Sequence, residues 1–163
     1  MNTSYERGSN TTDEWLTPKE IINALGHFDL DPCAPELRPW NTADTHYTKA
    51  DDGLSKGWFG RVWLNPPYSR PAVNQFIKKL ADHGNGVALI FNRCDTELFH
   101  SQVFNRADAI LFVRGRIRFC RPDGTLAGTP GCGSVLIAYG HDNVISLENS
   151  DINGKIVYLT HKK

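Results

Sequence analysis

A carboxamide, two consecutive prolines and a phenol ring follow one another in the segment Asn65-Pro66-Pro67-Tyr68, directly after a hydrophobic run. Proline has no amide hydrogen and a fixed φ, so the two prolines stiffen this turn and leave its carbonyl groups as acceptors. The side-chain oxygen of Asn65 and the carbonyl oxygen of Pro66 would converge on one amino group, with the ring of Tyr68 stacked on the planar system that carries it. The segment therefore predicts a site for a flat aromatic amine.

Methylation of a nucleobase amine is a reaction that needs such a site. The lone pair of an exocyclic amine is delocalised into the ring, so the amine is a weak nucleophile. Two acceptors on its two hydrogens favour a pyramidal nitrogen whose lone pair can be aimed at an electrophile, and an aromatic face would hold a base flipped out of the duplex. Taken alone, the segment fits equally well a rigid strand-to-helix turn in which Asn65 caps the helix and Tyr68 packs on the sheet.

The surrounding hydrophobic patterns predict strands that alternate with helices. Apolar runs predict strands at 28–31, 61–64, 86–91 and 109–113, and amphipathic patterns predict helices that begin at Pro18, at Pro71 and near Asp95. In the first helix, Thr17 would be the N-cap and Glu20 its partner in a capping box. Strands and helices in this order form right-handed crossovers and a parallel sheet, and ligands bind outside the carboxyl ends of such strands.

The rest of the chain predicts loops and hairpins. Residues 33–57 are rich in Pro, Asp, Thr and Gly and predict mostly loop. The turn sequences at 122–124 and 153–154, with hydrophobic runs at 117–120, 134–139, 144–147 and 156–159, predict hairpins added to the edge of the sheet.

The charge balance excludes bulk attraction to nucleic acid as the basis of binding. The chain has 18 basic and 18 acidic residues, so any contact with phosphate must come from a local patch. The segment from Arg114 to Arg121 is a candidate patch, in which Arg114, Arg116 and Arg118 recur at every second residue and would share one face of a strand, with Arg121 following. The alternative interpretation of these arginines is a solvated strand face without a ligand.

Several classes of protein are disfavoured by composition and spacing. Residues 1–12 are polar and are expected to form a flexible arm, followed by a single domain over 13–163. No run is long enough to span a membrane, and the four cysteines, without an export signal, indicate reduced thiols in a cytoplasm. Their irregular spacing argues against a structural zinc site, and we expect no metal.

The order and spacing of the motifs resemble those of the phage-type DNA N6-adenine methyltransferases, often called the phage Dam family. The resemblance runs from about Trp15 to Tyr139 and rests on Trp15-Leu16-Thr17-Pro18, Phe28-Asp29-Leu30-Asp31-Pro32 with Ala34, Tyr47-Thr48, Asp51-Asp52-Gly53-Leu54, Trp58 and Val62-Trp63-Leu64-Asn65-Pro66-Pro67-Tyr68-Ser69. It implies an α/β, Rossmann-like class I methyltransferase fold, complete or truncated, that is mainly parallel with an antiparallel C-terminal edge. It also implies S-adenosylmethionine as the cofactor and double-stranded DNA as the partner, in the cytoplasm of a bacterium that hosts a phage or prophage.

The resemblance also implies a role for individual residues. Asn65 and Pro66 would accept hydrogen bonds from the adenine amino group, and Tyr68 would stack on the ring. The cofactor residues would be Thr17 and Pro18 at its methionine end, Asp31 and Pro32 beside its amino acid or ribose, and Asp51 or Asp52 at its adenine. The candidate DNA contacts are Arg70, Arg93, Arg116, Arg118 and Arg121.

The chain departs from the wider methyltransferase pattern on the cofactor side. Residues 33–40, which follow Asp31-Pro32, contain no glycine, and only twenty residues separate Asp31 from Asp51. The ribose partner is therefore open among Asp31, Asp51 and Asp52. Three alternatives are kept: methylation of RNA, methylation of a protein glutamine, and a relative that binds DNA or cofactor without turnover. Oligomeric state is open between a monomer and a weak dimer.

Overall fold

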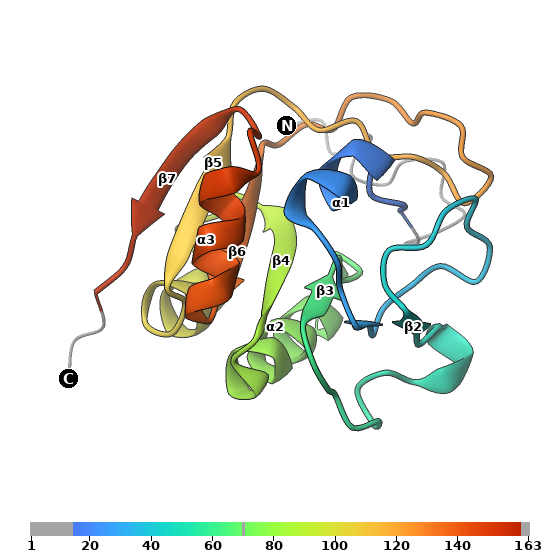
Figure 1. Ribbon diagram of the computed structural model, residues 1–163, viewed down its shortest axis with the longest axis horizontal. Coiled ribbons are helices and arrows are strands. Elements are labelled where there is room, and N and C mark those ends of the chain that lie inside the picture. The colour runs from blue at the N-terminus through green and yellow to red at the C-terminus, as the bar shows by residue number, and fades with distance from the viewer. Residues whose placement is uncertain (1–14, 70, 161–163) are drawn as a thin grey trace.

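The protein folds around one seven-stranded sheet with helices on both faces. The structure, a computed structural model, describes residues 15–69 and 71–160 (Figure 1). The strands are β1 (Leu30–Asp31), β2 (Thr45–His46), β3 (Val62–Leu64), β4 (Gly86–Phe91), β5 (Ala109–Val113), β6 (Ser134–Tyr139) and β7 (Gly154–Tyr158). The helices are α1 (Lys19–Leu25), α2 (Ala72–His83) and α3 (His141–Asn149), with a short 3-10 helix η1 (Lys49–Asp51) and a π-helix η2 (Phe99–Phe104). The expected arm over 1–12 lies outside the described residues.

The sheet has the order β2-β1-β3-β4-β6-β5-β7. Strands β1 to β4 pair in parallel, and β6 pairs antiparallel with both β4 and β5, so β5 runs in the same direction as β4. Strand β7 then pairs antiparallel with β5 at the edge. The predicted α/β fold, Rossmann-like with an antiparallel C-terminal part, is confirmed.

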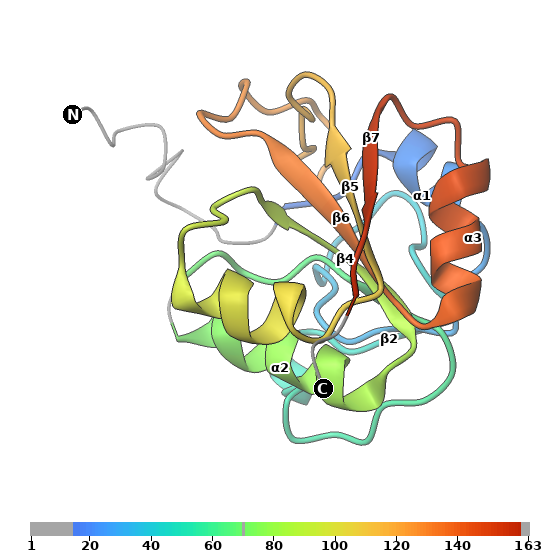
Figure 2. The ribbon, with the colours of Figure 1, turned by 90° about the vertical axis from the view of Figure 1, so that its left-hand side faces the viewer.

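The hydrophobic core lies in two layers, one on each face of the sheet. Figure 2 shows α2 on one side and α1 with α3 on the other. Helix α2 buries Val73, Phe76, Ile77 and Leu80, which recur at helical spacing, and it ends at Gly84 as predicted. Strands β4 and β6 carry buried side chains on both faces, because each face is covered by helices.

The amino ends of the central strands are tied to the second layer by Arg61. Its guanidinium lies 4.1 Å from the centre of the Phe28 ring and donates to Asn143 Oδ1 at 2.6 Å and Ser146 Oγ at 2.8 Å on α3. A planar guanidinium suits this role because it donates in several directions while its face covers an aromatic ring. Loops follow the carboxyl ends of β1, β3 and β4 at the opposite edge of the sheet.

The hairpins predicted around residues 122–124 and 153–154 form only in part. Residues 144–147 belong to α3 and not to a strand, because Val144 and Leu147 are spaced to bury one face of a helix. Strand β7 therefore pairs with β5 and not with its sequence neighbour. Residues 117–120 form no sheet strand, although the tight turn after them is present, with the Gly124 amide donating to the Arg121 carbonyl at 2.8 Å.

Three further predictions concern short elements and a helix cap. The region 33–57 is mostly loop, as predicted, and contains two short elements: β2, which adds a two-residue strand to the parallel sheet, and η1. The helix expected to begin near Asp95-Thr96-Glu97 is confirmed, because helical residues begin at Glu97 and continue as η2. Helix α1 has no side-chain hydrogen bond at its start, so the predicted capping box of Thr17 and Glu20 is wrong.

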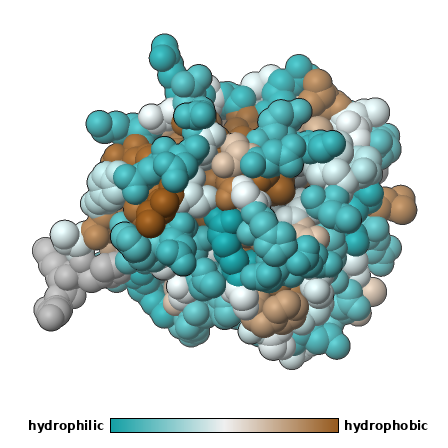
Figure 3. All heavy atoms as spheres, viewed as in Figure 1, coloured by the Kyte–Doolittle hydropathy of each residue, from teal (hydrophilic) through white to brown (hydrophobic). Residues whose placement is uncertain are grey.

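Hydrophilic side chains cover much of the face in Figure 3, with smaller hydrophobic patches between them. This is consistent with balanced charge and a buried core. Within the described ranges, none of the helices has the length and apolar character needed to cross a lipid bilayer.

Candidate active site

Asn65 lies at the carboxyl end of β3, and its side-chain amide is held by the segment that precedes α1. Asn65 Nδ2 donates to the carbonyl oxygen of Trp15 at 2.9 Å and to Thr17 Oγ1 at 3.2 Å. Both amide hydrogens are thus used within the protein, and Oδ1 faces away from that segment with only a long, 3.4 Å hydrogen bond from the Tyr68 hydroxyl. Asn65 therefore presents an acceptor to the site, and it does not cap α2, whose start has no side-chain hydrogen bond.

The ring of Tyr68 belongs to an aromatic cluster at the same edge. It stacks on Phe91, from the end of β4, with ring centres 4.2 Å apart, and meets Phe119 edge-on at 6.4 Å. Burial raises the pKa of the Tyr68 phenol well above its ordinary value, so the group stays neutral. The cluster gives the site a rigid, uncharged aromatic wall.

A cavity of about 210 Å³ adjoins this wall. Its lining includes Tyr68, Phe91, Arg93 and Glu97, which come from the ends of β3 and β4 and from the turn before η2. The guanidinium of Arg93 lies 5.7 Å from the centre of the Phe91 ring. Aromatic carbon and a few polar groups in one concave space are typical of ligand sites.

Asp31, the acid at the end of β1, is enclosed by protein. It is 2% exposed; its Oδ1 accepts from the Cys33 amide at 3.0 Å, and its Oδ2 accepts from the Thr42 hydroxyl. Burial raises the pKa of this carboxyl to about 6, against the opposing effects of the Thr42 and Cys33 hydrogen bonds and of nearby Arg38. Both oxygens are occupied, so Asp31 holds the 31–47 loop together.

His46 belongs to the same enclosed group. Its Nε2 accepts from the Thr42 amide at 3.3 Å, and burial, together with the charge of Arg38, lowers its pKa to about 4. The connection from β1 to β2 contains no helix, and the neutral imidazole of His46 and the buried carboxyl of Asp31 hold its loop through Thr42.

No glycine follows Pro32 directly, but Gly53 from a later segment packs against it. Gly53 packs so closely on Pro32 that a Cβ atom on Gly53 would collide with the Pro32 carbonyl oxygen. The segment that contains Gly53 therefore lies directly beside the end of β1.

The two acids before Gly53 have different surroundings. Asp51 Oδ2 accepts from the Thr48 amide at 2.8 Å and from its hydroxyl at 3.1 Å, and these hydrogen bonds lower the pKa of Asp51. Asp52 has a left-handed backbone, with φ of 56°, and an exposed carboxylate to which no described residue donates. Asp52 is therefore the acid of this segment that is available to a ligand.

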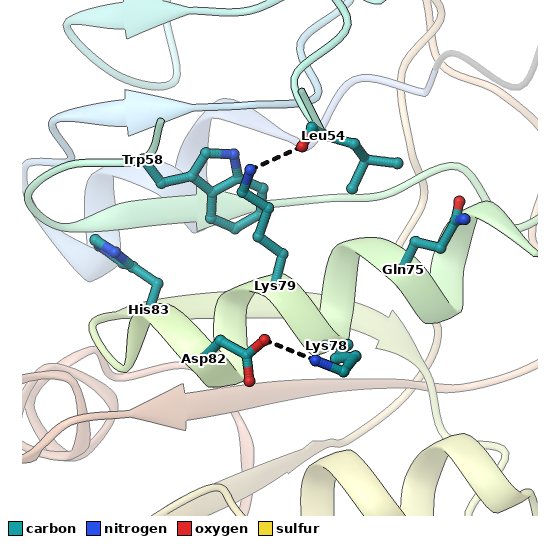
Figure 4. Close-up of a pocket in the computed structure, with 7 residues that line it drawn as sticks. All are labelled: Leu54, Trp58, Gln75, Lys78, Lys79, Asp82 and His83. Carbon is teal, nitrogen blue, oxygen red and sulfur yellow. Dashed lines mark hydrogen bonds and ion pairs between the residues drawn. The ribbon is translucent and has the colours of Figure 1, made fainter. Parts of the chain in front are cut away.

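Helix α2 clamps the segment that follows. Lys79 Nζ donates to the carbonyl oxygen of Leu54 at 2.8 Å (Figure 4). It also donates to the carbonyl oxygen of Lys56 at 2.6 Å, and the Trp58 indole donates to the Gly53 carbonyl at 2.9 Å. The indole also stacks on Phe76 of α2, with ring centres 6.3 Å apart. The helix that follows Tyr68 thus fixes the position of residues 53–58.

The candidate DNA-contacting arginines lie along the extended segment 114–121. Arg116, Arg118 and Arg121 are exposed, while Ile117 and Phe119 between them are buried, so the predicted alternation holds although no strand forms. One guanidinium nitrogen of each arginine donates to a carbonyl of the returning segment: that of Pro130, Ala127 and Leu126, respectively. Arg70 lies outside the described residues.

The structure brings together the residues predicted to bind the amine, one residue predicted to bind the cofactor and one predicted to bind DNA. Asn65, Pro66, Tyr68 and Thr17 share the carboxyl edge with Arg93. Sequence reasoning missed Phe91 and Phe119 in the aromatic cluster and the Trp15 carbonyl beside Asn65. A backbone carbonyl has no sequence signal, whereas the two phenylalanines, each next to a predicted arginine contact region, could have been considered.

One further group of polar residues lies at the other edge of the sheet. His27, Asp29 and Asp44 precede β1 and β2, are partly or fully exposed, and are the described trio close enough to share a metal ion. His27 Nε2 lies 2.7 Å from Asp44 Oδ2, so a surface hydrogen bond already joins two members of this cluster.

Comparison with known proteins identifies a family match and one relative. The family model described as DNA N-6-adenine-methyltransferase (Dam) matches residues 6–139. A DNA N-6-adenine-methyltransferase of Escherichia phage T1 is 31% identical over 121 residues, which cover 66% of this chain and 49% of the relative. The chain thus spans about half the length of that curated relative. No solved structure matches the chain significantly.

The enclosed Asp31 predicts a pH dependence of stability. The pKa of Asp31 is raised from 3.8 to about 6 on folding. The stabilisation of the folded state by the protonated carboxyl is therefore fully present below about pH 4 and is lost as the pH rises through 6. Relative to Asp31→Asn, the free energy of unfolding of the wild type should therefore fall by up to about 3 kcal/mol between pH 4 and pH 7. Urea unfolding at several pH values measures this difference.

The exposed Asp51 provides a matched control for that measurement. Because its pKa is lowered, Asp51→Asn should give a difference of opposite sign that is small. If the free energies of unfolding of the wild type and of Asp31→Asn changed equally with pH, the buried carboxyl would not have a raised pKa.

Proposed function

This chain belongs to the DNA N-6-adenine-methyltransferase (Dam) family, and from that premise we propose that it methylates N6 of adenine in double-stranded DNA with S-adenosylmethionine as methyl donor. The observation that carries the proposal is the orientation of the Asn65 amide. Its two hydrogens are bound within the protein and its oxygen faces the aromatic wall of Tyr68 and Phe91. This arrangement supports recognition of an amino group on a flat ring.

In the proposed reaction, Asn65 Oδ1 and the Pro66 carbonyl accept the two hydrogens of the adenine amine. These acceptors draw the nitrogen toward a pyramidal geometry, so its lone pair becomes available. A bound S-adenosylmethionine would supply the electrophilic methyl group, and its S–CH3 bond would break as the N–C bond forms, which leaves S-adenosylhomocysteine as the neutral thioether product. The amine proton leaves to water after the new N–C bond has formed, so the chain needs no general base. The neutral ring of Tyr68 stacks on the flipped base.

The residues beside β1 and β2 fit the cofactor. The exposed carboxylate of Asp52 suits the ribose hydroxyls, and Leu54, which is partly exposed, offers an apolar contact to a purine. Gly53 holds this segment against Pro32 at the end of β1. Of the three acids that the sequence leaves open, we assign the ribose to Asp52, since Asp31 and Asp51 are engaged by Thr42 and Thr48.

The arginine segment is proposed to bind DNA phosphate. Residues 114–130 contain four arginines and one acid, Asp123, whose carboxylate accepts from Thr125. The bonds from Arg116, Arg118 and Arg121 to carbonyl groups fix the loop and leave other guanidinium nitrogens for phosphate. Arg70 and Arg93 are further candidates, and the loop from Cys120 to Cys132 would reach base edges. We expect the reaction to take place in the cytoplasm of a bacterium that carries the phage or prophage.

Transfer of tritiated methyl groups tests the substrate class. The purified chain is incubated with labelled S-adenosylmethionine and with DNA, RNA or protein from a host without DNA methylation. We expect label in double-stranded DNA alone. Label in RNA or in protein would contradict the proposed substrate, and binding of cofactor or DNA without any transfer would favour a relative without turnover.

Asn65 variants test the proposed chemistry. Asn65→Ala should reduce methyl transfer below detection while the cofactor dissociation constant, measured by calorimetry, changes less than about twofold. Asn65→Asp is the matched variant, because it retains an acceptor oxygen and should keep part of the activity. Equal losses of activity and cofactor affinity in Asn65→Ala would show that the amide serves the cofactor and not the base.

The arginines are tested through the salt dependence of DNA binding. Each of Arg116→Ala, Arg118→Ala and Arg121→Ala should lower the slope of log Kd against log salt concentration by about 1, whatever the DNA sequence. Lys155→Ala, on the exposed edge strand β7, is the control and should leave the slope unchanged. Slopes that equal the wild-type value in all three variants would remove the segment from the DNA interface.

A further inference from the structure

The three residues Trp15, Leu16 and Thr17, which we call the strap, hold the side-chain amide of Asn65 by two hydrogen bonds. The strap is the start of the described chain and leads into α1 (Figure 1). Its Trp15 carbonyl and Thr17 hydroxyl accept the two Nδ2 hydrogens of Asn65, at 2.9 and 3.2 Å. The strap thus decides which end of the carboxamide faces the site.

The strap is itself rigidly held. The Leu16 amide donates to the Cys120 carbonyl at 2.8 Å, and the Cys120 amide donates back to Leu16 at 2.9 Å. The Trp40 indole donates to the Thr17 carbonyl at 3.1 Å. Leu16 and Thr17 are each 1% exposed. Because the backbone of Thr17 is fixed from two sides, its hydroxyl stays within reach of Asn65.

A carboxamide can turn by half a rotation and exchange its oxygen for its NH2 group. In the exchanged orientation Asn65 would point a donor at an amine that also donates, and Oδ1 would face the Trp15 carbonyl. The Trp15 carbonyl opposes this exchange because it can only accept. The Thr17 hydroxyl adds the second hydrogen bond, which fixes the plane of the amide against Trp15. Thr17 thereby acts on the reaction through Asn65.

We propose that Thr17 is a positioning residue that keeps the Asn65 oxygen directed at the target amine. The proposal rests on the function proposed above. It differs from the role that the family resemblance implies for Thr17, which is contact with the methionine end of the cofactor. A side chain that is buried and hydrogen-bonded to Asn65 has almost no surface left for such a contact.

Substitutions that remove or keep the hydroxyl separate the two roles. Thr17→Val preserves the shape of the side chain without its hydroxyl, and Thr17→Ala is a second variant without it. Thr17→Ser retains the hydroxyl. Tyr139→Phe removes a different buried hydrogen bond, from the Tyr139 hydroxyl to the Gln102 carbonyl at 2.6 Å, and controls for a general loss of stability.

The readouts are the single-turnover rate of methyl transfer to DNA at saturating cofactor, the cofactor dissociation constant and the melting temperature. Thr17→Val and Thr17→Ala should lower the rate about tenfold, as expected for one lost orienting hydrogen bond. Thr17→Ser should recover most of the rate, and Tyr139→Phe should keep the wild-type rate. Cofactor dissociation constants should stay within about twofold of the wild type in all four variants.

Three results would overturn the proposal while the wild type remains active. These are a wild-type rate in Thr17→Val and Thr17→Ala, an equal loss of rate in Tyr139→Phe, and weaker cofactor binding with an unchanged rate at saturation. A wild type that transfers no methyl group to DNA contradicts the proposed function itself, and the positioning role is then rejected with it.

Discussion

The structure of the candidate site depends on satisfying one carboxamide. Asn65 needs two acceptors for its amide hydrogens, and the chain supplies them from a segment 48 to 50 residues away in sequence. Cys120 pairs with Leu16 in that segment, which brings the arginine segment to the same edge. The amine site and the candidate DNA-contacting loop are therefore joined through a few backbone hydrogen bonds.

The cofactor side of the site solves a different constraint, the short connection between β1 and β2. No helix fits there, and the loop is held by the enclosed group of Asp31, Thr42 and His46. Close approach of backbone is achieved by Gly53, which packs against Pro32 from the next segment. The carboxyl of Asp31 lowers the free energy of unfolding at neutral pH, because its charged form is kept away from water.

Much of this architecture can be predicted from sequence where the signal is local. The amphipathic pattern of α2 and the apolar runs of β4, β5 and β6 appear as expected. Val144 and Leu147 misled the prediction, because two apolar residues at this spacing fit a strand end or a helix. Strand β2 has only two residues, and the contacts of Thr17 and Cys120 join distant segments, so neither has a local signature. The resemblance identified Asn65 and Tyr68 as site residues, whereas the separation of Asp52 from Asp31 and Asp51 required the hydrogen bonds of the structure.

The central claim, that the Asn65 amide presents adenine N6 for methylation, is tested most directly in cells. The chain is expressed in a host that has no DNA methylation of its own, and the genome is read by single-molecule sequencing that detects modified bases. The account predicts N6-methyladenine at one short recurring sequence. A genome without modified adenine despite folded protein, or one with methyl groups on cytosine, would contradict it.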